Sequence, residues 1–285
     1  MNPLNDIMAP IREELQQFEQ AYSQALSADA VPLLSSACEY IQLKKGKRLR
    51  PILTLLSAKA CGMPTDASIH TAVALEMLHA ASLIHDDVVD DSPMRHGQAA
   101  LHVRFNNKIA VLVGDYMFAT VTQVMSKIRE RQIADILSHI VSALVEGELM
   151  ELQQPEEWSE QHYLAMIEHK TAALFGACAE AGARSVNAPE AFCRALRQYG
   201  HDMGVCFQIQ DDILDIIGTD ELGKPTGADS KDGKRTLPYV RGVDYAMSVM
   251  SDYARQALTA LRVLPASEAT TALTQLLAFA AERRY

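Results

Sequence analysis

The chain has 285 residues and a net charge of −10, and it is rich in Ala, Leu, Glu and Gln with only 14 glycines. The acidic balance argues against a nucleic-acid binder, which usually carries a basic surface. Good helix formers without sustained period-two alternation predict an all-α protein, and we expect a single domain over residues 1–285.

The cysteines bear on the compartment, because they show no paired spacing. We expect free thiols in a reducing, cytoplasmic environment. No signal peptide is recognised, and no apolar run is judged long enough to span a bilayer, so no integral membrane segment is expected. The five cysteines are Cys38, Cys61, Cys178, Cys193 and Cys206.

Two helices are expected first, over residues 4–27 and 30–43, and a basic loop follows from Lys44 to Arg50. Pro51 suits the first turn of the next helix. Cations beside a helix N-terminus make an anion site, because the helix dipole and free N–H groups add to their charge. The alternative is a solvated loop without a ligand.

The expected helix 66–91 carries an acidic cluster of Asp86, Asp87 and Asp90. Asp86 and Asp90 lie one turn apart on one face, with Asp87 beside them. Three adjacent carboxylates repel one another unless a cation binds, and Mg²⁺ typically bridges carboxylates and substrate phosphates. The preceding run 80–84 is apolar, so we predict a magnesium–diphosphate site above an apolar cavity. The alternative is a solvated acidic helix end.

His79 and Ser82 lie on the same stripe as Asp86, two turns and one turn before it. We predict that His79 contacts a phosphate, although an isolated His on an apolar helix is more often a core residue. Ala81 and Ser82 are small, so the wall below the acidic cluster is expected to be open. Pro93 is expected to end this helix.

Three more helices are expected over residues 107–127, 131–152 and 160–183. The last of them contains Lys170 and Thr171, followed by small and apolar residues. A lone Lys on a mainly apolar helix is usually a surface residue whose ammonium reaches water. Beside a diphosphate, the same Lys170 would be a ligand.

The helix expected at 189–217 repeats the acidic spacing with Asp211, Asp212 and Asp215, and Gln208 shares a face with two of them. Two identical clusters on distant apolar helices are unlikely to arise by chance. If they face each other, they could hold several metal ions and one diphosphate between them. This is why we expect one domain with both clusters in one cavity.

A loop over residues 218–236 alternates glycines with cations, including Lys224 and Lys234. Such a loop could close over a phosphate and exclude water, and the alternative is a mobile surface loop. Two short helices, over 243–262 and 266–283, are expected to complete the chain.

Together these motifs resemble the trans-isoprenyl diphosphate synthases, the head-to-tail prenyl chain elongators. The match runs from Gly46–Pro51 to Thr236–Pro238 and includes both aspartate-rich motifs in order. The resemblance implies an all-helical bundle around a deep central cavity, usually a homodimer. It also implies repeated condensation of isopentenyl diphosphate with an allylic diphosphate, giving a trans-polyprenyl diphosphate.

The resemblance further implies a role for each matching residue. Mg²⁺, as three ions, would be held by Asp86, Asp87, Asp90, Asp211 and Asp215, with Asp212 in the same catalytic motif. The allylic diphosphate would be contacted by Arg95, Lys170, Lys224 and Lys234, with Thr171 and Gln208 beside them. Isopentenyl diphosphate would be bound by Lys47, Arg50, His79 and His96.

Two departures from the family pattern affect these expectations. His96 stands where the family has a second arginine, so its contact is expected to be weaker or to depend on protonation near neutral pH. The region after Pro238 is shorter than usual in the family, which would trim the back of the cavity or the dimer surface.

Product length should depend on the positions before the first cluster, where bulky aromatics stop growth early in the family. Here they are Ala81 and Ser82, so a long polyprenyl product, such as a quinone side-chain precursor, is expected. A cavity floor would lie deeper, at Met117, Phe118 or Met125. The alternative is a short-chain farnesyl or geranylgeranyl diphosphate synthase.

Three other functions compete with chain elongation. A class I terpene cyclase also ionises an allylic diphosphate, but the second cluster and the basic loop argue against it. A non-catalytic subunit of a heteromeric synthase is disfavoured by the intact clusters. An acidic helical scaffold would show no magnesium-dependent binding of diphosphate.

Overall fold

The computed structural model describes residues 3–28, 31–43, 46–95, 97–153, 155–217 and 234–282. These residues form helices almost throughout, which confirms the all-α prediction. In chain order the α-helices are α1 (Pro3–Ile7), α2 (Arg12–Ala25), α3 (Pro32–Gln42), α4 (Leu49–Cys61), α5 (Asp66–Val89), α6 (Leu101–Phe105), α7 (Asn107–Met125), α8 (Arg131–Leu152), α9 (Glu160–Ile167), α10 (Ala173–Arg184), α11 (Glu190–Ile217), α13 (Leu237–Arg241), α14 (Val243–Leu261) and α15 (Glu268–Glu282).

Two predicted helices are interrupted. The expected helix 4–27 is α1, a 3₁₀ turn η1 (Ala9–Ile11) and α2. Pro10 lacks a backbone N–H and cannot continue an α-helix, so the prediction of one helix is wrong. The expected helix 160–183 is likewise divided by a π-helical turn, η2 (Glu168–Ala172).

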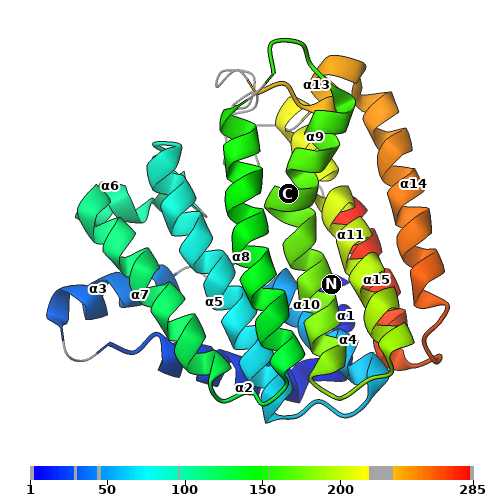
Figure 1. Ribbon diagram of the computed structural model, residues 1–285, viewed down its shortest axis with the longest axis horizontal. Helices are drawn as coiled ribbons and strands as arrows, with labels where there is room; N and C mark the ends of the chain where they lie inside the picture. The colour runs from blue at the N-terminus through cyan, green and yellow to red at the C-terminus, as the bar shows by residue number, and fades with distance from the viewer. Residues whose placement is uncertain are drawn as a thin grey trace.

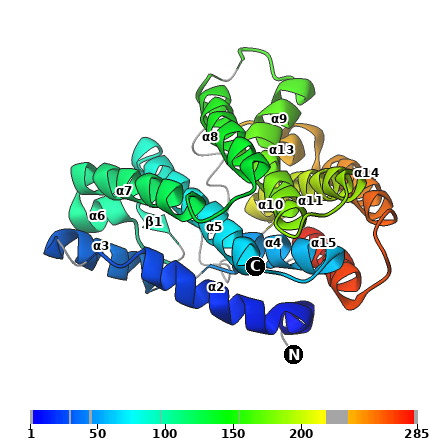
Figure 2. The same ribbon diagram turned by 60° about the horizontal axis from the view of Figure 1, so that its bottom comes forward.

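Helix α5 runs through the middle of the bundle, between α7 on one side and α8 on the other (Figure 1). Its first turn is fixed by a capping box, in which Thr65 and Ser68 bond each other's backbone. The helix packs along α7 and α4, and α10 packs between α4 and α11. Figure 2 shows α2 and α3 along one side of this core, apart from α14 on the opposite side.

Close contact between α10 and α11 depends on small residues. A side chain at Gly200 would overlap the backbone of Phe175, and one at Gly204 would overlap Ala172. These glycines therefore let α11 approach α10 and the end of η2 closely. The hydrophobic core is one continuous cluster that runs from Leu4 to Ala280, as a single domain requires.

Helix α5 is also long and apolar enough to span a membrane by length and composition, with a mean hydropathy of 1.3. The expectation that no run would reach this limit is therefore corrected. The apolar sequence of the helix is interrupted by Thr71, Glu76 and His79, but these residues do not bring its mean hydropathy below that of a membrane span. Of this apolar window, 67% is buried inside the protein, and a buried core helix commonly passes the same test.

After α5 the chain reverses through a short antiparallel ladder that was not predicted. It pairs β1 (Met94–Arg95) with β2 (Gln98–Ala99), in the register Met94 to Ala99 and Arg95 to Gln98. Asp91 adopts a positive φ of 48° at the start of the reversal. The hairpin brings Arg95 back toward the last turn of α5.

Candidate active site

The first acidic cluster lies at the C-terminal end of α5, where Asp90 is the C-cap residue. Asp87 is buried, with 3% of its surface exposed. Its carboxylate accepts hydrogen bonds from the Arg95 guanidinium, whose Nε lies 2.9 Å from Oδ1. The hairpin thus supplies a cation for the middle aspartate of the cluster and leaves Asp86 and Asp90 to other partners.

Asp86 has a strongly perturbed carboxyl group. Burial, and next the negative charge of Glu148, raise its pKa to about 7 against the opposing charge of Lys170, and Asp90 and Arg95 add smaller effects of opposite sign. The expected repulsion within the cluster is therefore present. A cation bound beside Asp86 would relieve it.

The donor atoms at this end of α5 suit Mg²⁺, because they are carboxylate oxygens. One of them, Glu148 Oε1 from α8, is buried and has no hydrogen-bond partner among the described residues. In the part of the chain that the structure describes, no three metal-binding side chains converge on one point. Mg²⁺ usually takes one or two carboxylates and completes its shell with water and substrate phosphates, so this arrangement fits it.

The second cluster, on α11, presents its three aspartates differently. Asp212 is buried, and it accepts hydrogen bonds from the Tyr163 hydroxyl at 2.5 Å and the Gln208 amide at 2.8 Å. Asp211 is exposed and Asp215 is half-buried. Asp212 therefore joins α11 to α9, whereas the side that Asp211 and Asp215 share is where a metal could be bound.

A hydrogen-bond chain links this cluster to the π-helical turn. The Thr171 hydroxyl donates to Gln208 Oε1 at 2.8 Å, and Gln208 in turn donates to Asp212. Thr171 is buried. The family resemblance implied that Thr171 and Gln208 both lie beside the allylic diphosphate, and the structure brings the two side chains into direct contact.

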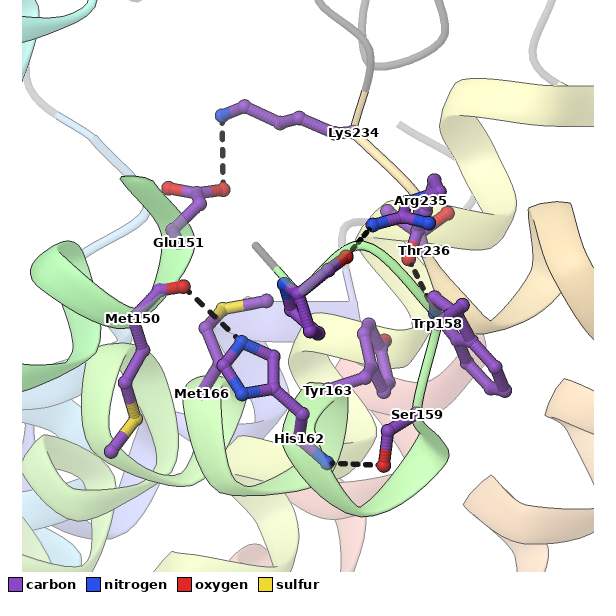
Figure 3. Close-up of a pocket in the computed structure, with 11 residues that line it drawn as sticks. Met150, Glu151, Trp158, Ser159, His162, Tyr163, Met166, Lys234, Arg235 and Thr236 are labelled. Atoms are coloured by element: carbon purple, nitrogen blue, oxygen red, sulfur yellow. Dashed lines mark hydrogen bonds and ion pairs between the residues drawn. The ribbon is translucent and has the colours of Figure 1, made fainter. Parts of the chain in front are cut away.

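Lys170, in the same turn, meets two glutamates from α8. Its ammonium lies 2.7 Å from Glu148 and is also paired with Glu151. Burial disfavours its charge, but Glu151 and Glu148 outweigh burial and raise the pKa of Lys170. Lys234 reaches the same Glu151 at 3.0 Å, as Figure 3 shows.

No role was assigned from the sequence to Glu148 or Glu151. They are three residues apart, so they share a face of the predicted helix 131–152. This spacing was the available signal. It could not show that the same face meets Lys170, since that contact depends on how α8 packs against η2.

The packing of α8 against η2 requires Gly147. A side chain there would overlap the backbone of Lys170. The π-helical turn adds one residue to the helical register at Lys170 and Thr171, and such bulges are frequent at functional sites. Glycine on one helix and the bulge on the other together place the Lys170 ammonium beside α8.

The basic loop before α4 divides into structural and candidate binding residues. Arg48 has a positive φ of 55°, and its guanidinium pairs with Glu76 at 2.6 Å and lies 4.6 Å from the centre of the Tyr22 ring. This cation therefore holds α4, α5 and α2 together.

Arg50 and His79, both predicted to bind isopentenyl diphosphate, are adjacent. Their Nη1 and Nε2 atoms lie 2.8 Å apart, and the Arg50 guanidinium lies 4.7 Å from the centre of the Phe175 ring. Lys47 is exposed, with its ammonium 5.7 Å from the centre of the Phe279 ring of α15. The other predicted ligands His96 and Lys224 lie outside the described residues.

The predicted length-determining residues have unequal exposure. Ala81 is fully buried in the core, whereas Ser82 is partly exposed and donates to the His79 carbonyl at 2.9 Å. Phe118, one predicted floor residue, lies with its ring centre 5.5 Å from that of His85. It is therefore level with the acidic cluster rather than deeper than Ala81.

The pocket in Figure 3 lies between the α8–α9 connection and Lys234. Its volume of about 30 Å³ holds a water or two but no prenyl chain. Its wall is held by Arg235, which donates to the carbonyls of Pro155 and Glu156, and by Trp158 Nε1, which donates to the Arg235 carbonyl at 2.8 Å. The deep central cavity stays a prediction.

Known proteins resemble this chain along nearly its whole length. The sequence profile of the polyprenyl synthetase family matches residues 31–271. An octaprenyl diphosphate synthase from Haemophilus influenzae is 33% identical, over 99% of this chain and 98% of its own. A short chain isoprenyl diphosphate synthase from Methanothermobacter thermautotrophicus is 30% identical, over 98% and 99%.

A solved structure has the same fold. The polyprenyl synthase from Caulobacter crescentus, complexed with calcium and isoprenyl diphosphate, superposes with a TM-score of 0.93 at 31% identity, over 99% of this chain and 98% of its own. These similarities point to the same family as the two aspartate-rich helices and the lysines around η2. The chain belongs to the polyprenyl synthetase family and is a trans-polyprenyl diphosphate synthase, a transferase that joins isopentenyl diphosphate head-to-tail to an allylic diphosphate.

Proposed function

We propose that the allylic diphosphate binds around η2, between the ends of α5 and α11. The observation that carries this proposal is that residues of η2 are linked to both acidic clusters. Lys170 acts electrostatically on Asp86, and Thr171 is bonded through Gln208 to Asp212. One anionic ligand at this turn would therefore be within reach of the lysine and of both sets of carboxylates.

Three Mg²⁺ ions are proposed as the cofactor, held by Asp86 and Asp90 from one side and Asp211 and Asp215 from the other. Asp87 was included as a ligand on sequence grounds. Its burial and its bonds to Arg95 support a different role, in which it holds that cation at the site. When bound, magnesium withdraws negative charge from the diphosphate as a Lewis acid.

The residues of the chain divide the remaining work. Lys170 and Lys234, with Arg95, donate to the diphosphate and stabilise the negative charge that develops as the allylic C–O bond breaks. Arg50 and His79 hold isopentenyl diphosphate so that its double bond attacks the allylic carbocation. The condensed carbocation then loses a proton to the departing pyrophosphate, and the electrons of the broken C–H bond form the new double bond. Apolar walls exclude water, which would otherwise quench the cation.

The test of this function is a product assay on the purified chain. With Mg²⁺, labelled isopentenyl diphosphate and primers of increasing length, we expect elongated products that retain the diphosphate. Asp86→Ala and Asp211→Ala should each abolish elongation. A hydrocarbon formed from the allylic substrate alone would indicate a cyclase, and an inactive but folded chain would indicate a partner subunit.

A long-chain product is proposed because small residues precede the first cluster, and octaprenyl synthases are among the relatives. Ser82, which keeps exposed surface, is the better position for a length test than the fully buried Ala81. We expect Ser82→Phe to shorten the product, and Ala81→Phe with Ser82→Phe to shorten it further if the double variant folds. Unchanged length in a folded Ser82→Phe would exclude this determinant.

We also propose a homodimer. Helices α7 and α8 carry large apolar side chains that are exposed in the single chain, including Leu112 at 62% and Val145 at 56%. Exposed apolar surface of this kind marks contact sites. Light scattering should give twice the chain mass, and Leu112→Asp should lower the measured mass.

We also propose a cytoplasmic location, since all five cysteines are free thiols.

A further inference from the structure

Glu151 on α8 joins the two lysines of the proposed diphosphate site. Lys234 Nζ lies 3.0 Å from one carboxylate oxygen, and Lys170 is paired with the other. Only 13% of the Glu151 side chain is exposed, and the lysine side chains are 25% and 26% exposed. The three charges are therefore shielded from solvent. Ion pairs are stronger in such surroundings than in water, because the effective dielectric constant is lower.

Without this carboxylate, two ammonium groups would be partly buried close to one another. Each lysine disfavours the charge of the other, as the lowering effect of Lys170 on the pKa of Lys234 shows. Glu151 removes this repulsion, and the two cations lower its own pKa against the effect of burial, so it is ionised. It brings together lysines from two distant segments, η2 and the segment before α13.

A carboxylate and a diphosphate are equivalent acceptors for these donors, since both offer anionic oxygens to an ammonium group. Lys170 and Lys234 cannot give the same N–H bonds to both at once. The partner glutamate Glu148 contacts Lys170 at 2.7 Å and acts on Asp86, whereas Glu151 is the residue that both lysines share.

We propose that Glu151 takes the place of the diphosphate when no substrate is bound, and that diphosphate binding releases Lys170 and Lys234 from it. Glu151 is thus a positioning residue that weakens diphosphate affinity while keeping both lysines at the site. The same exchange in reverse would help pyrophosphate to leave. This inference rests on the proposed function of the two lysines as diphosphate ligands.

The experiment compares Glu151→Gln with the parent chain, using inorganic pyrophosphate as the probe. Glutamine keeps the shape and an acceptor oxygen of Glu151 but removes its charge. Without ligand, the charges of Lys170 and Lys234 are then no longer neutralised by this side chain. We expect pyrophosphate to bind about tenfold more tightly in titration calorimetry, both with EDTA and with Mg²⁺. The KM for the allylic diphosphate should fall while kcat does not rise.

Thermal unfolding gives a second measurement. Without ligand, Glu151→Gln should melt at a lower temperature than the parent, and pyrophosphate should raise its melting temperature by more than it raises that of the parent. Glu146→Gln is the matched control, since it removes one charge from the same helix at a side chain that is 60% exposed. It should leave affinity unchanged, and Glu151→Asp should restore affinity close to that of the parent.

Two sets of results separate the inference from the proposed function. If Lys170→Ala and Lys234→Ala bind pyrophosphate as well as the parent, the proposed site is wrong. If those variants lose binding but a folded Glu151→Gln binds no more tightly, the site stands and the inference is overturned. An equal tightening in Glu146→Gln would also overturn it, because the effect would then come from net charge.

Discussion

The two acidic clusters have the same spacing in the sequence but different surroundings in the structure. In each, the middle aspartate is buried. Asp87 is held by the Arg95 guanidinium, whereas Asp212 is held by the neutral donors of Tyr163 and Gln208. The first cluster is also crowded by Glu148, which helps to raise the pKa of Asp86 to about 7. Among the described residues, the middle aspartate is thus paired with a cation in one cluster and accepts hydrogen bonds from neutral donors in the other.

The largest effect should come from the outer aspartates. Asp86→Asn and Asp211→Asn remove a proposed metal ligand while keeping side-chain size, and each should lower kcat by about a thousandfold. Steady-state elongation with saturating Mg²⁺ measures this. Because Asp86 stands among more negative charges, its variant should also fold more stably in EDTA, and Asp211→Asn should not. Equal stability changes would remove the electrostatic distinction between the clusters.

The second effect is a pH dependence of stability that arises from Asp86. The pKa of Asp86 is raised by folding, so the native state binds the extra proton. The stabilisation of the native state by this proton is complete below about pH 4 and is lost as the pH rises through about 7. The loss in unfolding free energy is about 2 kcal/mol after solvent screening. Urea unfolding in EDTA at pH 5 and pH 8 should show this loss in the parent, and Asp86→Asn should lack it.

A smaller effect is expected on stability, where replacing the middle aspartate should cost more in the first cluster than in the second. Asp87→Asn leaves the partly buried Arg95 without its counter-charge and should cost about 1.5 kcal/mol of unfolding free energy. Asp212→Asn keeps an acceptor for neutral donors and should cost less, about 1 kcal/mol. Raising the salt concentration should reduce the loss of stability in Asp87→Asn and leave that in Asp212→Asn unchanged. A larger loss in Asp212→Asn than in Asp87→Asn, measured by urea unfolding, would contradict the proposed difference between the clusters.

The smallest effect tests the second cluster alone. Tyr163→Phe removes the hydroxyl that donates to Asp212 and leaves the ring in the core. We expect a loss of about 1 kcal/mol in stability, because one acceptor on Asp212 loses a partner. Elongation by the folded variant should change little, since Gln208 still holds the same carboxylate. A loss of activity as large as that of Asp211→Asn would show that Asp212 acts directly in catalysis.

The sequence predicted what depends on local pattern. Helix 131–152 was predicted with the bounds of α8, and the two acidic clusters are on the predicted helices α5 and α11. The break after α1 does have a local cause in the sequence, because Pro10 cannot continue an α-helix. The family resemblance correctly indicated the reaction, since it rests on several motifs in fixed order.

The sequence could not predict features that arise only from packing. The π-helical turn has no local marker among the residues around Lys170, and Glu148 and Glu151 look like ordinary helix surface. Their roles depend on Gly147, which brings α8 against the backbone of Lys170. Taken alone on a mainly apolar helix, Lys170 is more typical of a surface residue, and its place at the site follows from its two acidic partners on α8.

The extra residue in η2 makes the length of this segment as important as its composition. An α-helix turns by about 100° per residue. Deleting one residue between Glu168 and Ala172 would remove the extra residue, so α9 and α10 would merge into an uninterrupted helix with both flanks in register. The residues inside the turn, Lys170 and Thr171 among them, would instead be shifted around the helix axis by up to about that angle and leave the site. Natural insertions and deletions should therefore be excluded from this turn, and a single-residue deletion should inactivate a chain whose helical content is undiminished.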